Sequence, residues 1–283
     1  ESLTLESIYQ DHYFKSDYIG RIRWLEDGSG YTAIENSTAE NKSGEKEIVR
    51  YNPEDLSRDV LVSAQQLTPT GTDKALTIDD YIWSEDRNKL LIYTNSKKVW
   101  RSNSRGDYWL LDLQTNQLKQ LGDKLASPSS LMFAKFSSNG DKVAYVFDNN
   151  IYVENLTNGN IKQLTFDATA SVINGVFDWV YEEEFIIRDG FRWSPDGSKI
   201  AYWQLDTSGS KDFMMINNTD GLYPTITKFP YPKVGETNAL AKIAVVNVDS
   251  AESTWMDLPD NSRNMYVPRM NWSGNSEEVL IQH

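Results

Sequence analysis

The residues that most clearly suggest chemistry are three adjacent carboxylates, Glu182-Glu183-Glu184. They follow the run Val176-Phe177-Asp178-Trp179-Val180-Tyr181 and precede Phe185-Ile186-Ile187. Because apolar and aromatic flanks favour burial, we expect these acids to be held at the edge of a packed structure. Carboxylates held close together at such an edge are suited to binding a cation. The α-ammonium group of a peptide, which is protonated near neutral pH, is one candidate.

A short helix over residues 178–187 would carry the three glutamates. Neighbouring side chains on a helix lie about 100° apart, so all three cannot face one ligand, although two can converge if the helix is short or irregular. Two close carboxylates raise each other's pKa, and a nearby cation offsets that effect. Arg101, in Val99-Trp100-Arg101-Ser102-Asn103, is a candidate for that cation. The simpler alternatives are a solvated acidic helix face and an ordinary arginine at the edge of a sheet.

Several kinds of active site are excluded by composition. The chain has no cysteine, which removes disulfides, zinc–thiolate sites and cysteine nucleophiles. It has two histidines, His12 and His283, and no Gly-x-Ser-x-Gly motif, so we expect neither a Ser-His-Asp triad nor a histidine metal site. Asp27, Asp141 and Asp196 invite comparison with calcium ligands, but each stands in a turn, where aspartate is common. We therefore expect no catalytic residue, metal or other cofactor in this chain.

Length and charge limit the possible partners. The 283 residues are enough for one large β domain or two ordinary domains. There are 28 Lys and Arg against 41 Asp and Glu, a net charge of −13, which argues against nucleic acid because phosphate contacts need a basic surface. No apolar stretch approaches the ~18 residues of a membrane-spanning helix. The chain begins at Glu1 without an initiator Met, which is typical of a sequence from which an upstream segment has been removed.

A repeat runs through the chain and predicts its fold. In each unit an aromatic residue is followed by a turn rich in Ser, Asp and Gly and then by an apolar strand, so each unit contains a β-hairpin. Four strands per repeat, at a period near 55 residues, predict an all-β protein built from the four-stranded antiparallel blades of a β-propeller. The leading aromatics are spaced by 59, 53, 57 and 79 residues and are Trp24, Trp83, Phe136, Trp193 and Trp272.

Other segments refine this prediction. Second hairpins are expected over residues 108–121 and 151–165, and short helical segments over residues 3–10 and 178–187. The long fourth interval holds an extra hairpin, residues 213–238, whose Pro-rich end excludes it from the centre of a sheet.

The last residues, Val279-Leu280-Ile281-Gln282-His283, lie in an apparent strand of a fifth repeat that has only just opened. A propeller needs closure, because an open last blade leaves unpaired edges. We therefore expect a partial propeller that belongs to a longer protein.

One motif also resembles a known family. The segment Asn174-Gly175-Val176-Phe177-Asp178-Trp179-Val180-Tyr181-Glu182-Glu183-Glu184 closely resembles the glutamate motif of the dipeptidyl peptidase IV family, which are prolyl-oligopeptidase-type serine exopeptidases. The similarity extends over essentially all 283 residues in the same order. The other matching segments are Leu5-Glu6-Ser7-Ile8-Tyr9, Val99-Trp100-Arg101-Ser102, residues 142–153, and Phe229-Pro230-Tyr231-Pro232-Lys233-Val234-Gly235 with Asn238.

The resemblance implies a fold and a function. Residues 1–283 would form the N-terminal portion, about half, of an eight-bladed propeller that caps an α/β-hydrolase domain. The catalytic Ser, Asp and His and the proline pocket would lie outside this chain, which would therefore be inactive alone. Glu183 and Glu184 would bind the free N-terminus of a peptide, Arg101 would orient them and the substrate carbonyl, and Glu182 would support them. The full-length protein would then remove Xaa-Pro or Xaa-Ala dipeptides.

Two further implications concern partners and location. The hairpin of residues 213–238 resembles the dimerisation arm of the family and implies a homodimer. After Glu184 the match to animal members needs a one-residue gap, and the chain is more similar to bacterial members, which implies a periplasmic, secreted or cell-envelope location.

Alternatives remain open at this point. Prolyl tripeptidyl peptidases share such a propeller, so the released fragment could have two or three residues. Trp-Ser-Pro-Asp-Gly repeats also occur in TolB-like propellers that bind partners without catalysis, and the acidic motif would then be a peptide- or protein-binding edge.

Overall fold

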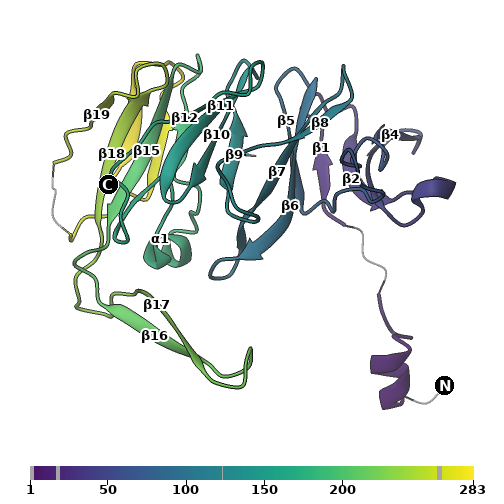
Figure 1. Ribbon diagram of the computed structural model, residues 1–283, viewed down its shortest axis with the longest axis horizontal. Helices are drawn as coiled ribbons and strands as arrows, with labels where there is room; N and C mark the ends of the chain where they lie inside the picture. Colours follow the sequence, from purple (N-terminus) through teal and green to yellow (C-terminus); the bar gives the residue numbers. More distant parts are fainter. Residues whose placement is uncertain (1–2, 17–19, 123, 260–262) are drawn as a thin grey trace. The chain divides into compact units, whose positions relative to one another are not determined.

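Strands dominate the computed structural model of the chain, and helices are few (Figure 1). The structure describes residues 3–16, 20–122, 124–259 and 263–283. These belong to two compact units, residues 1–78 and residues 79–283. The helical segments of the described residues are η1 (Glu6–Gln10), η2 (Glu40–Lys42) and α1 (Trp179–Glu184).

The first unit contains one four-stranded antiparallel sheet in the order β1-β2-β3-β4. The helical segment predicted over residues 3–10 is confirmed as η1, a π-helical turn. Its start is held by reciprocal hydrogen bonds in which Thr4 N–H donates to Ser7 Oγ (3.0 Å) and Ser7 N–H donates to Thr4 Oγ1 (3.1 Å). The strands are β1 (Ile22–Trp24), β2 (Tyr31–Asn36), β3 (Lys46–Tyr51) and β4 (Arg58–Val62).

The second unit begins with two regular blades, in which each strand pairs with the next along the chain. Backbone hydrogen bonds between Gly106 and Leu131, of 3.0 and 3.1 Å, join the two sheets. The hairpins predicted over residues 108–121 and 151–165 are confirmed. The strands are β5 (Asp80–Trp83), β6 (Lys89–Lys98), β7 (Asn103–Asp112), β8 (Gln117–Gln120), β9 (Met132–Phe136), β10 (Lys142–Phe147), β11 (Asn150–Asn155) and β12 (Ile161–Gln163).

The third sheet of this unit has five strands instead of the predicted four, in the order β13-β15-β18-β19 with β14 also paired to β15. The extra hairpin predicted within residues 213–238 is confirmed as β16 and β17, and a last pair is formed by β20 and β21. Figure 1 shows α1 and the β16–β17 hairpin on the same side of these sheets. The strands are β13 (Val172–Asn174), β14 (Phe191–Trp193), β15 (Lys199–Asp206), β16 (Asp212–Asn217), β17 (Thr225–Pro230), β18 (Leu240–Asn247), β19 (Ser253–Trp255), β20 (Arg269–Trp272) and β21 (Val279–Gln282).

The fifth strand arises because the chain leaves the sheet and returns to it. β13 and β14 pair with opposite ends of β15, and the intervening segment carries α1. At the point of departure and return, Gly190 N–H donates to the Gly175 carbonyl (3.0 Å). A Cβ at Gly190 would lie 2.6 Å from the carbonyl carbon of Gly175, so only glycine permits this approach. Gly175 also has a φ of +70°, a conformation that favours glycine.

The repeated turns are held by their own side chains. In the fourth repeat, Ser194 Oγ donates to Asp196 (2.6 Å) and accepts from Lys199 N–H (2.9 Å). Asp27 and Asp141 likewise bond to neighbouring turn residues. Hydrogen bonds from Ser194 and Ser198 lower the pKa of Asp196. These aspartates therefore accept hydrogen bonds that hold their turns, as predicted.

Candidate functional site

Helix α1 carries the three glutamates and has a defined start and end. Asp178 is its N-cap, because its Oδ1 accepts a hydrogen bond from Tyr181 N–H at 3.0 Å. The helix ends at Glu184, and its C-cap Phe185 donates its N–H to the Tyr181 carbonyl, so the helix is shorter than the predicted 178–187. Burial raises the pKa of Asp178 to about 6, while the backbone N–H groups of the cap act in the opposite direction.

One face of α1 is anchored in the core by aromatic side chains. Tyr181 is buried and stacks on Phe177 with 5.3 Å between ring centroids, and Phe177 meets the edge of Trp203 at 5.2 Å. Val267 N–H donates to the Tyr181 hydroxyl (3.0 Å), and Trp203 Nε1–H donates to the Val267 carbonyl (2.8 Å). Because these buried polar groups are satisfied, this face of the helix is fixed in orientation.

The three glutamates have three different surroundings. Glu182 is buried and accepts a hydrogen bond from Arg188 Nε at 3.1 Å, and burial raises its pKa. Glu183 Oε2 lies 2.7 Å from Arg101 Nε, and its side chain is 12% exposed. Glu184 is exposed and has no hydrogen bond or ion pair with the part of the chain that the structure describes. The helix thus presents one paired carboxylate and one free carboxylate side by side in sequence.

Arg101 reaches Glu183 from a different blade. It lies in the connection between β6 and β7, where Val99 N–H donates to the Ser102 carbonyl at 2.8 Å. Its side chain is 79% exposed, so the pair contributes little to stability, and the guanidinium keeps N–H donors that face solvent. The structure therefore brings together Arg101 and Glu183, as the sequence predicts, and leaves Arg101 able to bond a further acceptor.

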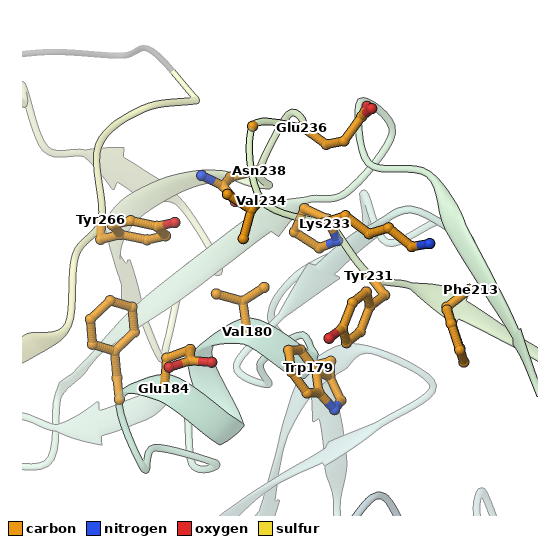
Figure 2. A pocket seen from close by; sticks show the side chains of 13 residues that line it. Trp179, Val180, Glu184, Phe213, Tyr231, Lys233, Val234, Glu236, Asn238 and Tyr266 are labelled. Carbon is orange, nitrogen blue, oxygen red and sulfur yellow. The ribbon is translucent and has the colours of Figure 1, made fainter.

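A pocket of about 800 Å³ adjoins Glu184. Figure 2 shows Trp179, Val180 and Glu184 of α1 on one side of it and the segment from Tyr231 to Asn238 on the other. Its walls are mainly aromatic and apolar, whereas its charges come from Glu184, Lys233 and Glu236. The other lining residues are Phe185, Phe213, Pro232, Val234, Gly235 and Tyr266. An apolar pocket with a free carboxylate at its edge is suited to a ligand that has an ammonium group beside an apolar body.

The sequence did not predict the aromatic residues that join the β16–β17 hairpin to the site. The Trp179 ring lies 4.3 Å from Tyr231, and the Trp100 ring lies 4.6 Å from Phe229, measured between centroids. Trp179 and Trp100 were visible in the sequence beside the acidic run and beside Arg101. Their ring partners in the hairpin lie more than 50 residues away along the chain, so the sequence did not pair them. The partner of Glu182, Arg188, was also not predicted.

Other features of the chain lie outside this pocket. His12 belongs to the first unit and His283 follows β21, and neither lines the pocket. Over residues 3–16, 20–122, 124–259 and 263–283, no group of three acidic or histidine side chains has the geometry of a metal site. None of the helices in these same ranges is long and apolar enough to cross a membrane.

The fold and this site define a partial β-propeller in which one short helix carries Glu183, paired with Arg101, and Glu184, at the edge of a pocket. A sequence profile of the family described as the dipeptidyl peptidase IV (DPP IV) N-terminal region matches residues 84–283. The chain therefore belongs to this family.

Individual relatives support the same assignment. The chain is 29% identical over 242 residues to dipeptidyl aminopeptidase B of Saccharomyces cerevisiae. The aligned region covers 83% of this chain and 28% of that protein. It is 27% identical over 202 residues to inactive dipeptidyl peptidase 10 of Rattus norvegicus, covering 70% of this chain and 25% of that protein. The crystal structure of Porphyromonas gingivalis dipeptidyl peptidase 4 superimposes with a TM-score of 0.84 at 29% identity, covering 99% of this chain and 38% of that one. The chain thus spans less than two fifths of the length of each of these relatives.

Proposed function

We propose that this chain is the part of a serine-type dipeptidyl peptidase that recognises the free N-terminus of the substrate. The observation that carries the proposal is the placement of Glu183 and Glu184 on one short helix, with Glu183 2.7 Å from Arg101 and Glu184 unpaired beside a pocket. Hydrolysis would take place in another part of the full-length protein, since the chain contains no Gly-x-Ser-x-Gly motif.

The chemistry of this recognition follows from charge. An α-amino group with a pKa near 8 is mostly protonated at neutral pH and donates charge-assisted hydrogen bonds to carboxylates. The exposed N–H groups of Arg101 would bond the carbonyl of the first substrate residue. A peptide with an acylated N-terminus brings no charge to the glutamates and leaves Glu184 desolvated without a cationic partner, so it is rejected. Recognition of the terminus then fixes how far along the peptide the cleaved bond lies, with Xaa-Pro or Xaa-Ala dipeptides as the products.

The test uses the full-length protein that carries this chain. An unblocked Xaa-Pro anilide and its N-acetylated twin are assayed with the wild type, Glu183→Gln and Glu184→Gln. Each substitution is expected to lower kcat/KM for the unblocked substrate about 10- to 100-fold, as for loss of a hydrogen bond to a charged group, and the acetylated substrate is not cleaved. Glu252→Gln, at an exposed carboxylate outside the pocket, is the matched control. Equal rates in all four proteins would remove the glutamates from the proposal.

A non-catalytic role is the second candidate, and the name of the rat relative, an inactive dipeptidyl peptidase, is the observation that favours it. In that case the same pocket binds a peptide or protein without hydrolysis. Absence of turnover of the unblocked substrate by the full-length wild type, together with binding of the same peptide, would move this candidate to first place.

We also propose a homodimer and a location. The outward face of the β16–β17 hairpin carries Met214, Ile216 and Ile226, which are 56%, 64% and 59% exposed. Ile216 and Ile226 are cross-strand partners, so they form one apolar surface suited to a second copy of the chain.

The similarity to bacterial dipeptidyl peptidases supports a periplasmic or cell-envelope location, which fractionation of the cells would test.

A further inference from the structure

The β16–β17 hairpin begins and ends in a compact group of three aromatic rings. Phe213 and Phe229 are cross-strand partners with 5.9 Å between ring centroids, and Tyr231 lies 5.4 Å from Phe213 and 6.2 Å from Phe229. Tyr231 N–H donates to the Lys211 carbonyl (3.0 Å), which closes the hairpin at its base. We call Phe213, Phe229 and Tyr231 the arm root.

The arm root contacts both segments that carry the ion pair of the site. Phe229 is buried and packs against Trp100, the residue before Arg101, at 4.6 Å. Tyr231 packs against Trp179, the first residue of the helix that carries Glu183, at 4.3 Å. Two segments about 80 residues apart, one with the cation and one with the carboxylates, therefore rest on the same three rings.

The Arg101 segment needs such support. Its backbone is strained at Trp100, where φ is +44°, a region that bulky residues rarely adopt, and conformations of this kind persist only where the surroundings hold them. The Arg101 side chain is 79% exposed, and a pair with one exposed partner does not by itself fix long side chains in one geometry. The contact between Trp100 and Phe229 supplies a buried anchor one residue from the guanidinium.

We propose that Phe229 and Tyr231 are positioning residues for N-terminus recognition. Phe229 holds the Arg101 segment, Tyr231 holds helix α1 through Trp179, and the ring contacts between them set the spacing of Arg101 from the two glutamates. The proposal rests on the proposed function, since it assigns to the arm root the alignment of that same ammonium site. The arm root would then help to recognise the substrate, whether or not the rest of the β16–β17 hairpin binds a partner.

The test measures how strongly the full-length protein distinguishes a free α-ammonium group from its absence. The probes are an Xaa-Pro dipeptide and its des-amino analogue, used as competitive inhibitors, and the readout is the ratio of their two inhibition constants. Phe229→Ala and Tyr231→Ala are each expected to reduce this ratio about threefold to tenfold, as for loss of one aromatic pair. Tyr231→Phe keeps the ring and is expected to keep the ratio. Phe166→Ala, at an aromatic residue that is 69% exposed and outside the pocket, is the matched control.

The coupling between the arm root and the helix has its own measurement. In a double-mutant cycle, Tyr231→Ala and Trp179→Ala together should reduce the ratio hardly more than either alone, because both remove the same contact. If an alanine variant does not fold, Phe229→Leu and Tyr231→Leu, which keep apolar volume but remove the ring, are judged by the same ratio.

Two results would overturn the inference. One is that both inhibition constants stay at their wild-type values in the Phe229 and Tyr231 variants while Glu184→Gln still lowers the ratio, which would leave the proposed function standing. The other is an equal weakening of both inhibitors, which is the signature of general structural damage. A ratio that is insensitive to Glu184→Gln as well would instead contradict the proposed function itself.

Discussion

At the scale of single residues, the three glutamates show how neighbouring side chains of one type acquire different properties. Their positions on a six-residue helix send Glu182 into the core, Glu183 to Arg101 and Glu184 to the pocket. Burial raises the pKa of Glu182, and Arg188 acts against that shift. The family resemblance set Glu182 apart from Glu183 and Glu184, but residue type alone could not, because the difference depends on which face of the helix Tyr181 anchors.

The N-cap of this helix gives a pH-dependent prediction. Because the pKa of Asp178 is raised to about 6 in the folded protein from an ordinary 3.8, the unfolded chain loses this proton first as pH rises. The stability that protonation contributes is complete below about pH 4 and is lost as pH rises through 6. Asp178→Asn keeps a cap acceptor without this titration, so it should stabilise the protein at pH 7 by up to about 3 kcal/mol. Denaturant unfolding at pH 4 and pH 7 measures the difference, and a variant that gains no stability over the wild type as pH rises would contradict it.

At the scale of elements, the excursion from β13 to β14 places helix α1, and two glycines make it possible. Gly190→Ala would put a Cβ 2.6 Å from the carbonyl carbon of Gly175, so the backbone must shift. We expect a loss of about 1–3 kcal/mol in the free energy of unfolding, as for other overpacked sites. Gly221→Ala, where the nearest atom is 3.7 Å away, should change stability by less than about 0.5 kcal/mol. Equal effects of the two substitutions in urea unfolding would show that the excursion is not held by this close approach.

The elements also show what a sequence can predict. Hairpins of the blades were predictable because apolar alternation and Ser-x-Asp-Gly turns are local signals, and the turn at Ser194 forms as expected. The split of one strand into β13 and β14 was not predictable from the sequence, because it depends on the contact between Gly175 and Gly190. Arg101 and Glu183 were paired through the family resemblance, whereas Phe229 and Tyr231 join the site only through tertiary packing.

At the scale of the whole molecule, the hairpin β16–β17 is the feature that we propose to contact a second copy of the chain. If its outer face binds a second copy, Ile216→Glu should place a charge in that interface and convert the full-length dimer to a monomer. Sedimentation velocity at micromolar concentration measures this directly. Phe166→Glu, at an exposed aromatic residue outside the hairpin, is the control and should leave the oligomeric state unchanged. A wild-type protein that sediments as a monomer would contradict the dimer proposal.

The central claim is that Glu183 and Glu184 bind the free N-terminus of a peptide, and direct binding tests it best. Calorimetry with the full-length protein would compare an Xaa-Pro dipeptide and its N-acetyl form in the wild type and in Glu184→Gln. The account predicts that the wild type binds the free dipeptide at least about tenfold more tightly than the acetylated form, and that Glu184→Gln removes most of this difference. Equal affinity of the wild type for both peptides would contradict it.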